Sequence, residues 1–351
     1  MKILVLCLPA IGDGLMITPM IRVLRKRFPN AEIDVACMMG GVQYVFKNNP
    51  YISQVHFLSI YTKNWVRGIF QILSLRKRKY DVSILSFPSY RREYHWVQAV
   101  IGAKKSIAHL FSTGYWLEFN FLNTDLVAVD EASHNVINNL NLTYALDIDW
   151  RKYLEEKNVR YDLKLDTLDI DFGKDYVKRL GWSNKKIVAI HPGSTNSPAA
   201  LLRRWPSDRY AQVARYLIRK NYKVIIFAGP EEKEVGNELE RFVHSKQCHL
   251  VDNVNFNQSL GILNQMDLLV CNDNGFGHLA NALGKEIVTL WASTNDKWSL
   301  PINKKLVTLV RAPKFIPWYR YILKRSIPKG VSGGMEQIQV KEVIEAIEKT
   351  L

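Results

Sequence analysis

Short apolar runs alternate with stretches of helical periodicity along almost the whole chain. The runs that predict buried strands are 2–8, 32–37, 54–58, 80–86 and 104–109 in the first half, and 186–191, 222–228, 248–251, 267–271 and 286–291 in the second. Apolar residues between these runs recur at the spacing of amphipathic helices. Helices that connect strands buried on both faces are typical of parallel sheets, so the pattern predicts a doubly wound α/β fold.

The same pattern divides the chain into two halves. Residues 158–185 are polar, and their only strong helical piece is 176–180. A chain of 351 residues also exceeds what one hydrophobic core usually supports. We therefore expect two domains and a closing amphipathic helix, with the boundaries 1–167, 168–337 and 338–351.

The first apolar run leads directly into a turn that contains Gly12 and Asp13. In doubly wound sheets ligands bind at the carboxyl ends of the strands, which makes the Asp13 carboxylate a first candidate for chemistry. The helix that follows ends near Phe28. Thr18 and Pro19 fit two different starts for this helix, either as its N-cap and first residue or with Pro19 inside a helix that begins earlier.

Two polar segments of the second half follow strands in the same way. Ser194 and Thr195 come after the run 186–191, and Arg203 and Arg204 follow closely. Hydroxyls, backbone N–H groups and arginines after a strand predict a phosphate site. From the residues alone, a solvated basic loop is an equally good explanation.

Carboxylates follow the next strand of the second half. Glu231 and Glu232 come after the run 222–228, where an acidic side chain can accept hydrogen bonds from a ribose diol. Acidic residues also suit the dipole at a helix N-terminus, and from the residues alone this structural explanation is the stronger.

The most informative local segment is 271–280. Asp273, Asn274 and Gly275 follow an apolar strand and open a helix, and His278 lies in its first turn. A glycine lets a ligand approach the backbone, and a helix N-terminus presents unpaired N–H groups to an anion. His278 is either a ligand contact or a buried, hydrogen-bonded histidine.

Composition narrows the class of partner. The net charge is +15, from 48 basic and 33 acidic residues, and favours nucleic acid, an anionic membrane surface or a phosphorylated substrate. The four cysteines are scattered without paired spacing, so we expect buried free thiols and no zinc site. The N-terminus is a poor signal peptide, and no apolar run reaches the ~18 residues of a membrane span. These features predict a cytosolic protein.

Three further segments combine aromatic and basic residues. Tyr90, Arg91 and Arg92 follow the run 80–86 and would suit an acidic acceptor, although a solvated loop explains them equally well. Residues 314–325 fit either an interfacial membrane anchor or a loop with aromatic core contacts. For residues 64–80 we expect ordinary amphipathic packing with a basic end.

These motifs, taken in order, resemble those of glycosyltransferase family 9, the heptosyltransferases of lipopolysaccharide core assembly. The resemblance rests on Gly12-Asp13 with Thr18-Pro19, His191-Pro192-Gly193-Ser194, Arg203-Arg204-Trp205-Pro206 and Asp273-x-Gly275-x-x-His278-Leu279-Ala280. It implies a GT-B architecture, in which two Rossmann-like domains face each other across a cleft. It also implies inverting, metal-independent transfer from a nucleotide-activated sugar, commonly ADP-heptose, with no cofactor.

The resemblance assigns roles to individual residues. Asp13 would be the general base, and Gly12, Tyr90, Arg91 and Arg92 would lie at the acceptor. The donor would be held by Ser194 or Thr195, Arg203, Arg204, Glu231 or Glu232, Asp273, Asn274, Gly275 and His278. The partners would be a nucleotide-sugar and an anionic glycolipid or saccharide acceptor, with work at the cytoplasmic face of the inner membrane as a peripheral protein.

The sequence departs from the family pattern at the donor loops. The loop between Gly193 and Arg203 is longer than usual, and Ala292-Ser293-Thr294 replaces a common Gly-Pro-Thr. Two other functional classes are alternatives. A nicotinamide-dependent oxidoreductase would need a G-x-G-x-x-G turn after the first strand, which is missing. A nucleic-acid-binding protein is suggested by charge alone, and we expect no nucleic-acid partner.

Overall fold

The computed structural model describes all residues of the chain except 9, 62–64, 112–115, 117, 195–197 and 315–332. The chain divides into two compact units. The first comprises Met1–Lys164 with Lys297–Ser299, and the second comprises Leu165–Asp296 with Leu300–Leu351. Each unit is an α/β structure built on one parallel sheet.

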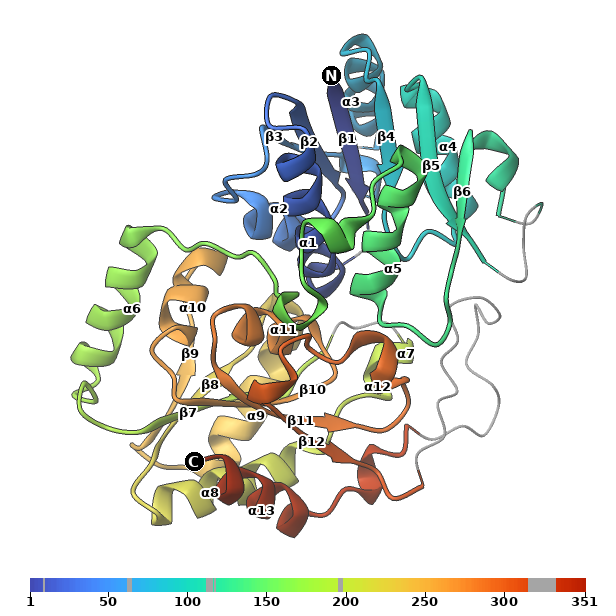
Figure 1. Ribbon diagram of the computed structural model, residues 1–351. Coiled ribbons are helices and arrows are strands. Elements are labelled where there is room, and N and C mark those ends of the chain that lie inside the picture. The colour runs from blue at the N-terminus through green and yellow to red at the C-terminus, as the bar shows by residue number, and fades with distance from the viewer. Residues whose placement is uncertain (9, 62–64, 112–115, 117, 195–197, 315–332) are drawn as a thin grey trace. The chain divides into compact units, whose positions relative to one another are not determined.

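The first unit contains the strands and helices of the N-terminal half of the chain. Its strands are β1 Lys2–Cys7, β2 Glu32–Cys37, β3 Gln54–Phe57, β4 Val82–Leu85, β5 Lys105–Leu110 and β6 Asp125–Ala128. Its helices are α1 Ile11–Arg27, α2 Gly40–Phe46, α3 Trp65–Lys77, α4 Arg92–Ile101 and α5 Asn135–Asn141. Helices α1, α2 and α5 cover one face of the sheet, and α3 and α4 cover the other (Figure 1).

The second unit repeats this organisation. Its strands are β7 Ile187–His191, β8 Lys223–Phe227, β9 Cys248–Val251, β10 Leu268–Asn272, β11 Glu286–Trp291 and β12 Val307–Arg311. The remaining helices are α6 Thr167–Arg179, α7 Pro198–Leu201, α8 Ser207–Arg219, α9 Lys233–Val243, α10 Phe256–Leu263, α11 Gly275–Ala282, α12 Asp296–Ser299 and α13 Val340–Thr350. Helix α8 packs against both α9 and α13, whereas α6 packs against α10 on the other side of the sheet.

Both sheets have the same strand order. Among the described residues the first runs β3-β2-β1-β4-β5-β6 and the second runs β9-β8-β7-β10-β11-β12, all parallel. The order reverses between β1 and β4 in one sheet and between β7 and β10 in the other. Ligands of such sheets bind outside the carboxyl ends of the strands at this reversal. The fold therefore marks one candidate edge in each unit.

All ten strands expected from the apolar runs are confirmed, and two strands were missed. The missed strands, β6 and β12, are the outer strands at one end of each sheet, and most of their residues are only half-buried. An edge strand needs no continuous apolar run, because one of its sides is not covered by another strand. All four cysteines are free and buried, as expected.

Helix α1 settles the two alternatives for its start. It begins at Ile11, so Pro19 lies inside the helix. Proline has no N–H to donate to the Leu15 carbonyl one turn earlier. The Thr18 hydroxyl donates to that carbonyl instead, at 2.7 Å, and accepts from the Asp162 N–H at 2.9 Å. Thr18 thus replaces the hydrogen bond that Pro19 removes.

Helix α6 is much longer than the expected piece 176–180, since it starts at Thr167. The prediction was wrong because the helix is anchored by glycine contacts and not by an apolar stripe. A Cβ atom on Gly173 would lie 2.0 Å from the Gly261 carbonyl oxygen, and a Cβ on Gly261 would lie 1.8 Å from the Asp169 carbonyl oxygen. The backbones of α6 and α10 therefore touch, which an apolar-periodicity search does not detect.

Candidate active site

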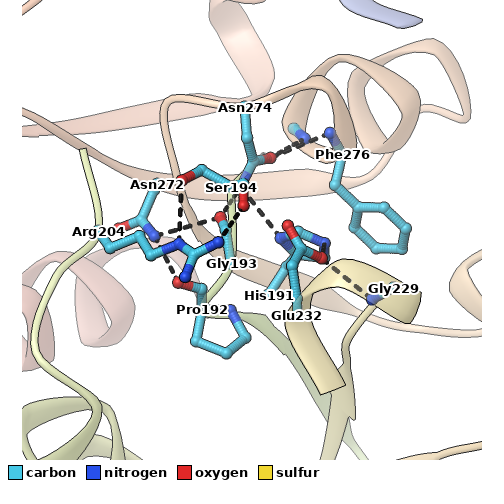
Figure 2. Close-up of polar contacts among 11 residues, drawn as sticks. His191, Pro192, Gly193, Ser194, Arg204, Gly229, Glu232, Asn272, Asn274 and Phe276 are labelled. Carbon is cyan, nitrogen blue, oxygen red and sulfur yellow. Dashed lines mark hydrogen bonds and ion pairs between the residues drawn. The ribbon is translucent and has the colours of Figure 1, made fainter. Parts of the chain in front are cut away.

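Polar side chains gather at the carboxyl ends of β7 and β10, the reversal point of the second sheet (Figure 2). His191 ends β7 and Asn272 ends β10, so each buried apolar strand finishes on a polar residue. The loops that follow carry Ser194 and Asn274, and Arg204 reaches this edge from further along the chain. The segments predicted as phosphate loops are therefore brought together by the sheet.

Asn274 fixes the geometry of this edge. It is the N-cap of α11, and its Oδ1 accepts from the N–H groups of Phe276 and Gly277 at 3.0 and 3.3 Å. With Oδ1 committed to these donors, Nδ2 must point the other way. It donates to the Gly193 carbonyl at 2.9 Å and to His191 Nδ1 at 3.0 Å.

The same chain of bonds assigns the His191 tautomer. Since Nδ1 accepts from Asn274, Nε2 carries the proton and donates to Glu232 Oε2 at 3.3 Å. The imidazole also stacks on the Phe276 ring, with centroids 4.5 Å apart. His191 thus joins three loops of the second unit: those that follow β7, β8 and β10.

Glu232 is a buried carboxylate held by donors on several sides. Burial alone would raise its pKa, but His191, the Gly229 N–H and the Arg204 guanidinium together lower the pKa of Glu232 to about 2. Gly229 N donates to Oε2 at 3.0 Å. A Cβ on Gly193 would lie 2.3 Å from Glu232 Cδ, so only a glycine leaves room for this side chain.

The two arginines of the predicted phosphate site are anchored within the second unit. Arg204 Nε donates to Ser194 Oγ at 3.1 Å, and a second nitrogen of the same guanidinium bonds the Ser194 carbonyl. Arg203 Nη1 pairs with Asp273 Oδ2 at 3.1 Å, and the Thr294 hydroxyl donates to the same oxygen. The edge therefore brings cationic, hydroxyl and carboxylate groups close together.

Asn272 connects several segments of this edge through hydrogen bonds. It is fully buried, and its Oδ1 accepts from the Trp205 N–H at 3.1 Å and the Tyr210 hydroxyl at 2.9 Å. Its Nδ2 donates to the Pro192 carbonyl at 2.8 Å. Trp205 is buried in the hydrophobic core of the second unit rather than lying over a solvated loop.

Burial distinguishes several of the predicted residues from one another. His278 is buried, and burial lowers its pKa to about 4 although Asp273 opposes the shift, so the imidazole is neutral at pH 7. Glu231 is exposed, whereas the neighbouring Glu232 is enclosed by the bonds described above. Thr195 lies outside the described residues.

The reversal point of the first sheet carries the other predicted group. Asp13 stands in the first turn of α1, directly after the strand β1, and is half-buried. Its Oδ2 accepts from the Ala10 N–H at 3.2 Å, as the carboxylate of a capping box does. Gly12 is buried beside it, and a Cβ on Gly14 would lie 3.0 Å from Val42 Cγ1. The first turn of α1 thus packs closely against α2.

The proposed acceptor residues follow β4, which is the neighbour of β1 in the sheet. Tyr90 packs edge-on against Phe111, with ring centroids 6.3 Å apart. Arg91 is the N-cap residue of α4, and Arg92 is its first residue; both are exposed. The sheet thus brings Tyr90, Arg91 and Arg92 to the edge that holds Asp13.

Sequence reasoning missed several residues that organise the polar edge of the second sheet. His191, Asn272 and Thr294 were not proposed as site residues, although each makes a bond described above. The available signal was a polar residue at the last position of an otherwise apolar strand, which applies to His191 and Asn272. Over the described part of the chain, no group of three or more His, Cys, Asp and Glu side chains could hold a metal ion.

Comparison with known proteins agrees with this architecture. Lipopolysaccharide heptosyltransferase 2 of Salmonella typhimurium is 24% identical over 100% of this chain and 99% of its own. The solved structure of the ADP-heptose lps heptosyltransferase II of E. coli has a TM-score of 0.75 at 21% identity, over 100% of this chain and 98% of the other. A glycosyl transferase family 9 structure from Veillonella parvula has a TM-score of 0.82 at 21% identity, over 99% and 96%.

These likenesses establish the fold as GT-B, with two Rossmann-like sheets. The family model described as glycosyltransferase family 9 (heptosyltransferase) matches residues 73–315, which cover the end of α3, the segment of Tyr90 to Arg92 and the polar edge of the second sheet. Several residues of the motifs that suggested this family, among them Asp13, Ser194 and Asn274, lie at the two sheet edges that the fold marks for ligands. The chain belongs to glycosyltransferase family 9 and is a transferase.

Proposed function

We propose that this enzyme transfers a heptose from ADP-heptose to a hydroxyl of lipopolysaccharide inner core, with inversion at the anomeric carbon and without a metal ion. The observation that carries the proposal is the placement of Asp13 in the first turn of α1, at the reversal point of the first sheet. The donor is suggested by the similar E. coli enzyme, an ADP-heptose lps heptosyltransferase. The acceptor is suggested by the similar Salmonella enzyme, which is a lipopolysaccharide heptosyltransferase.

In this mechanism the acceptor oxygen forms a bond to the anomeric carbon as the bond to the diphosphate breaks. The Asp13 carboxylate takes the proton of the attacking hydroxyl, and ADP leaves with the bonding electrons. General-base help of this kind is worth about 10²–10⁴-fold in rate. Attack from the face opposite the leaving group in one displacement gives inversion.

The second unit would hold the leaving diphosphate. Ser194, Arg203, Arg204 and the N-terminus of α11 at Gly275 offer hydroxyl and N–H donors at one sheet edge. Preorganised donors of this type stabilise charge that develops on a leaving group. This requires the guanidiniums to turn part of their donor set from Ser194 and Asp273 to the phosphates.

The remaining groups of the donor edge divide between direct contact and support. Asp273 would accept hydrogen bonds from sugar hydroxyls, and Glu231, the exposed acid of its pair, would bind the ribose diol. The linked side chains of His191, Glu232 and Asn274 would hold in place the loops that bind the donor. We propose no cofactor and no nucleic-acid partner, and we place the enzyme in the cytoplasm at the inner membrane.

The test is the Asp13→Asn enzyme. Asparagine keeps an oxygen that can accept from the Ala10 N–H, so the cap of α1 survives while the base is lost. We expect kcat to fall by about 10²–10⁴-fold, with the dissociation constant for ADP unchanged. Transfer is measured as ADP released with a purified, acyl-free inner-core acceptor, and ADP affinity by calorimetry.

Glu342→Gln is the matched control. Glu342 plays the same structural role in α13, where its Oε2 accepts from the N-cap N–H of Gln339 at 2.7 Å. Glu342→Gln removes one negative charge from a helix-capping carboxylate, as Asp13→Asn does, and we expect this variant to keep full activity. An Asp13→Asn enzyme that transfers heptose within a fewfold of the wild-type rate would show that Asp13 is not the base.

A further inference from the structure

Helix α3 has an apolar face that no described part of its own unit covers. Its inner residues, Gly68, Ile72 and Leu75, are buried. A Cβ on Gly68 would lie 2.9 Å from the Ile60 backbone nitrogen, so this inner side is already in close contact with the chain before it. The inner residues therefore already pack α3 against its own unit, and this packing does not use the outer residues.

The outer face of α3 is nevertheless apolar, and we name it the outer stripe. Its exposed side chains are Trp65, Val66, Ile69, Phe70 and Leu73. Their spacing places them on one side of a helix. Phe70 is 68% exposed and Trp65 is 58% exposed. The expectation of ordinary packing for this segment was therefore wrong for Trp65 and Ile69, whereas Ile72 is buried as expected.

A stripe of this kind is unusual on a soluble surface, where large contiguous apolar patches mark interaction sites. The charged residues of α3 indicate which kind of partner would bind the outer stripe. Helix α3 has no acidic residue, and it exposes Arg67, Arg76 and Lys77. A second copy of the chain would bring the same cations face to face, so a symmetric dimer is opposed by like charges. A negatively charged apolar surface satisfies both features.

We propose that the outer stripe lies in the interface of an anionic lipid bilayer, with Arg67, Arg76 and Lys77 at the headgroups. Interfacial helices combine large apolar side chains on one face with basic residues beside them, which is the pattern of α3. Helix α3 is too short to cross a bilayer, and no helix in the described part of the chain is long and apolar enough to do so.

The position of α3 connects this surface to the acceptor. The helix follows β3 and so begins at the carboxyl edge of the first sheet, the edge that holds Asp13. Docking through the outer stripe would present this edge to a lipid-anchored acceptor. This connection rests on the proposed function, whereas binding to lipid does not.

The test is flotation of the full chain with vesicles. Vesicles of phosphatidylethanolamine and phosphatidylglycerol are compared with neutral phosphatidylcholine vesicles, using wild type and the double variant Trp65→Ser, Phe70→Ser. We expect wild type to bind the anionic vesicles and the double variant to lose at least about tenfold in partition coefficient. Leu168→Ser with Phe242→Ser, two residues of the second unit that are 79% and 40% exposed, is the matched control and should bind as wild type.

A second pair tests the charges. Removing two cations near an anionic surface with Arg67→Gln and Lys77→Gln should lower the partition coefficient by about 30-fold. The inference would be overturned if wild type did not bind anionic vesicles, or if the Trp65→Ser, Phe70→Ser variant bound them as wild type does. A wild-type dimer, seen by light scattering, that the Trp65→Ser, Phe70→Ser variant converts to a monomer would also overturn it.

Activity separates this inference from the proposed function. The double variant should transfer heptose to a soluble, acyl-free acceptor at the wild-type rate, because neither substituted residue belongs to the proposed machinery. Wild type that binds vesicles but transfers no heptose would refute the proposed function and leave the lipid surface standing.

Discussion

The bonds around Glu232 make the Glu232→Gln variant a quantitative test of how the donor edge is built. Glutamine has nearly the shape of glutamate but presents only one acceptor oxygen and adds an amide donor. Glu232 Oε2 receives the Gly229 N–H at 3.0 Å and His191 Nε2 at 3.3 Å. The variant therefore keeps the volume of the side chain while it loses the charge that these donors face.

The magnitude follows from the pKa of Glu232, which falls from 4.5 to about 2 in the folded chain. A pKa shift of one unit corresponds to about 1.4 kcal/mol, so the ionised carboxylate adds about 3 kcal/mol to the free energy of unfolding. Because the folded pKa is the lower one, this contribution is complete above about pH 4.5. It disappears as the pH falls from there to about 2.

The assay is urea denaturation of wild type and variant at several pH values. We expect Glu232→Gln to lose about 3 kcal/mol at pH 7, and the difference from wild type to shrink through the acid window. Glu231→Gln is the control, because it removes the same charge from the adjacent, exposed residue and should change the free energy of unfolding by less than about 0.5 kcal/mol. Equal effects of the two variants, or a difference that does not depend on pH, would refute the reasoning.

Two further predictions concern stability. His278 has a folded pKa of about 4, below the ordinary value of 6.5, so the unfolded chain binds the proton first and stability falls as the pH drops from 6.5 to 4. This loss is about 2 kcal/mol at pH 5, and His278→Gln should remove it from the pH dependence of urea denaturation. Gly261→Ala would place a Cβ 1.8 Å from a carbonyl oxygen of α6 and should cost at least about 3 kcal/mol. Gly40→Ala, where a Cβ meets nothing within 4 Å, should be neutral in the same assay, and equal stability of the two alanine variants would exclude the close contact.

The features that could be predicted from the sequence are those that depend on local pattern, above all the positions of the buried strands. Strands buried on both faces, such as β1 and β7, are apolar over almost their whole length, so their positions could be predicted directly. The rule that ligands bind at the carboxyl ends of parallel strands then predicted a place for Asp13 at such an edge. By contrast β6 and β12 lie at sheet edges and are only half-buried, so their sequences carry a weak signal.

The bonds within the site could not be predicted, because they join residues far apart in the chain. Nothing near Glu232 indicates that it meets His191, which lies in another loop, or that Gly193 leaves room for it. For the same reason the sequence could not show that Glu231 is exposed whereas Glu232 is buried. The exposure of the outer stripe of α3 could not be predicted, because periodicity shows that a helix has apolar residues but not which of them other residues cover.

The repeated strand order explains how one topology can serve two chemistries. In both sheets the reversal point offers two loops, one after the first strand of the unit and one after the fourth. In the first unit the earlier loop enters a helix at once, so Asp13 sits in a first turn that its own carboxylate caps. In the second unit the earlier loop, at Gly193, is instead held by Asn274 from the loop after the fourth strand.

In the proposed mechanism, this difference decides which edge suits each step of transfer. A general base needs one carboxylate at a defined place, and a helix whose first turn packs closely at Gly14 supplies it. A diphosphate needs several donors that converge from different directions, and two loops tied by Asn274 and crossed by Arg204 supply them. The division of labour that we propose between the units would therefore follow from how each first loop leaves its strand, although the strand order is the same.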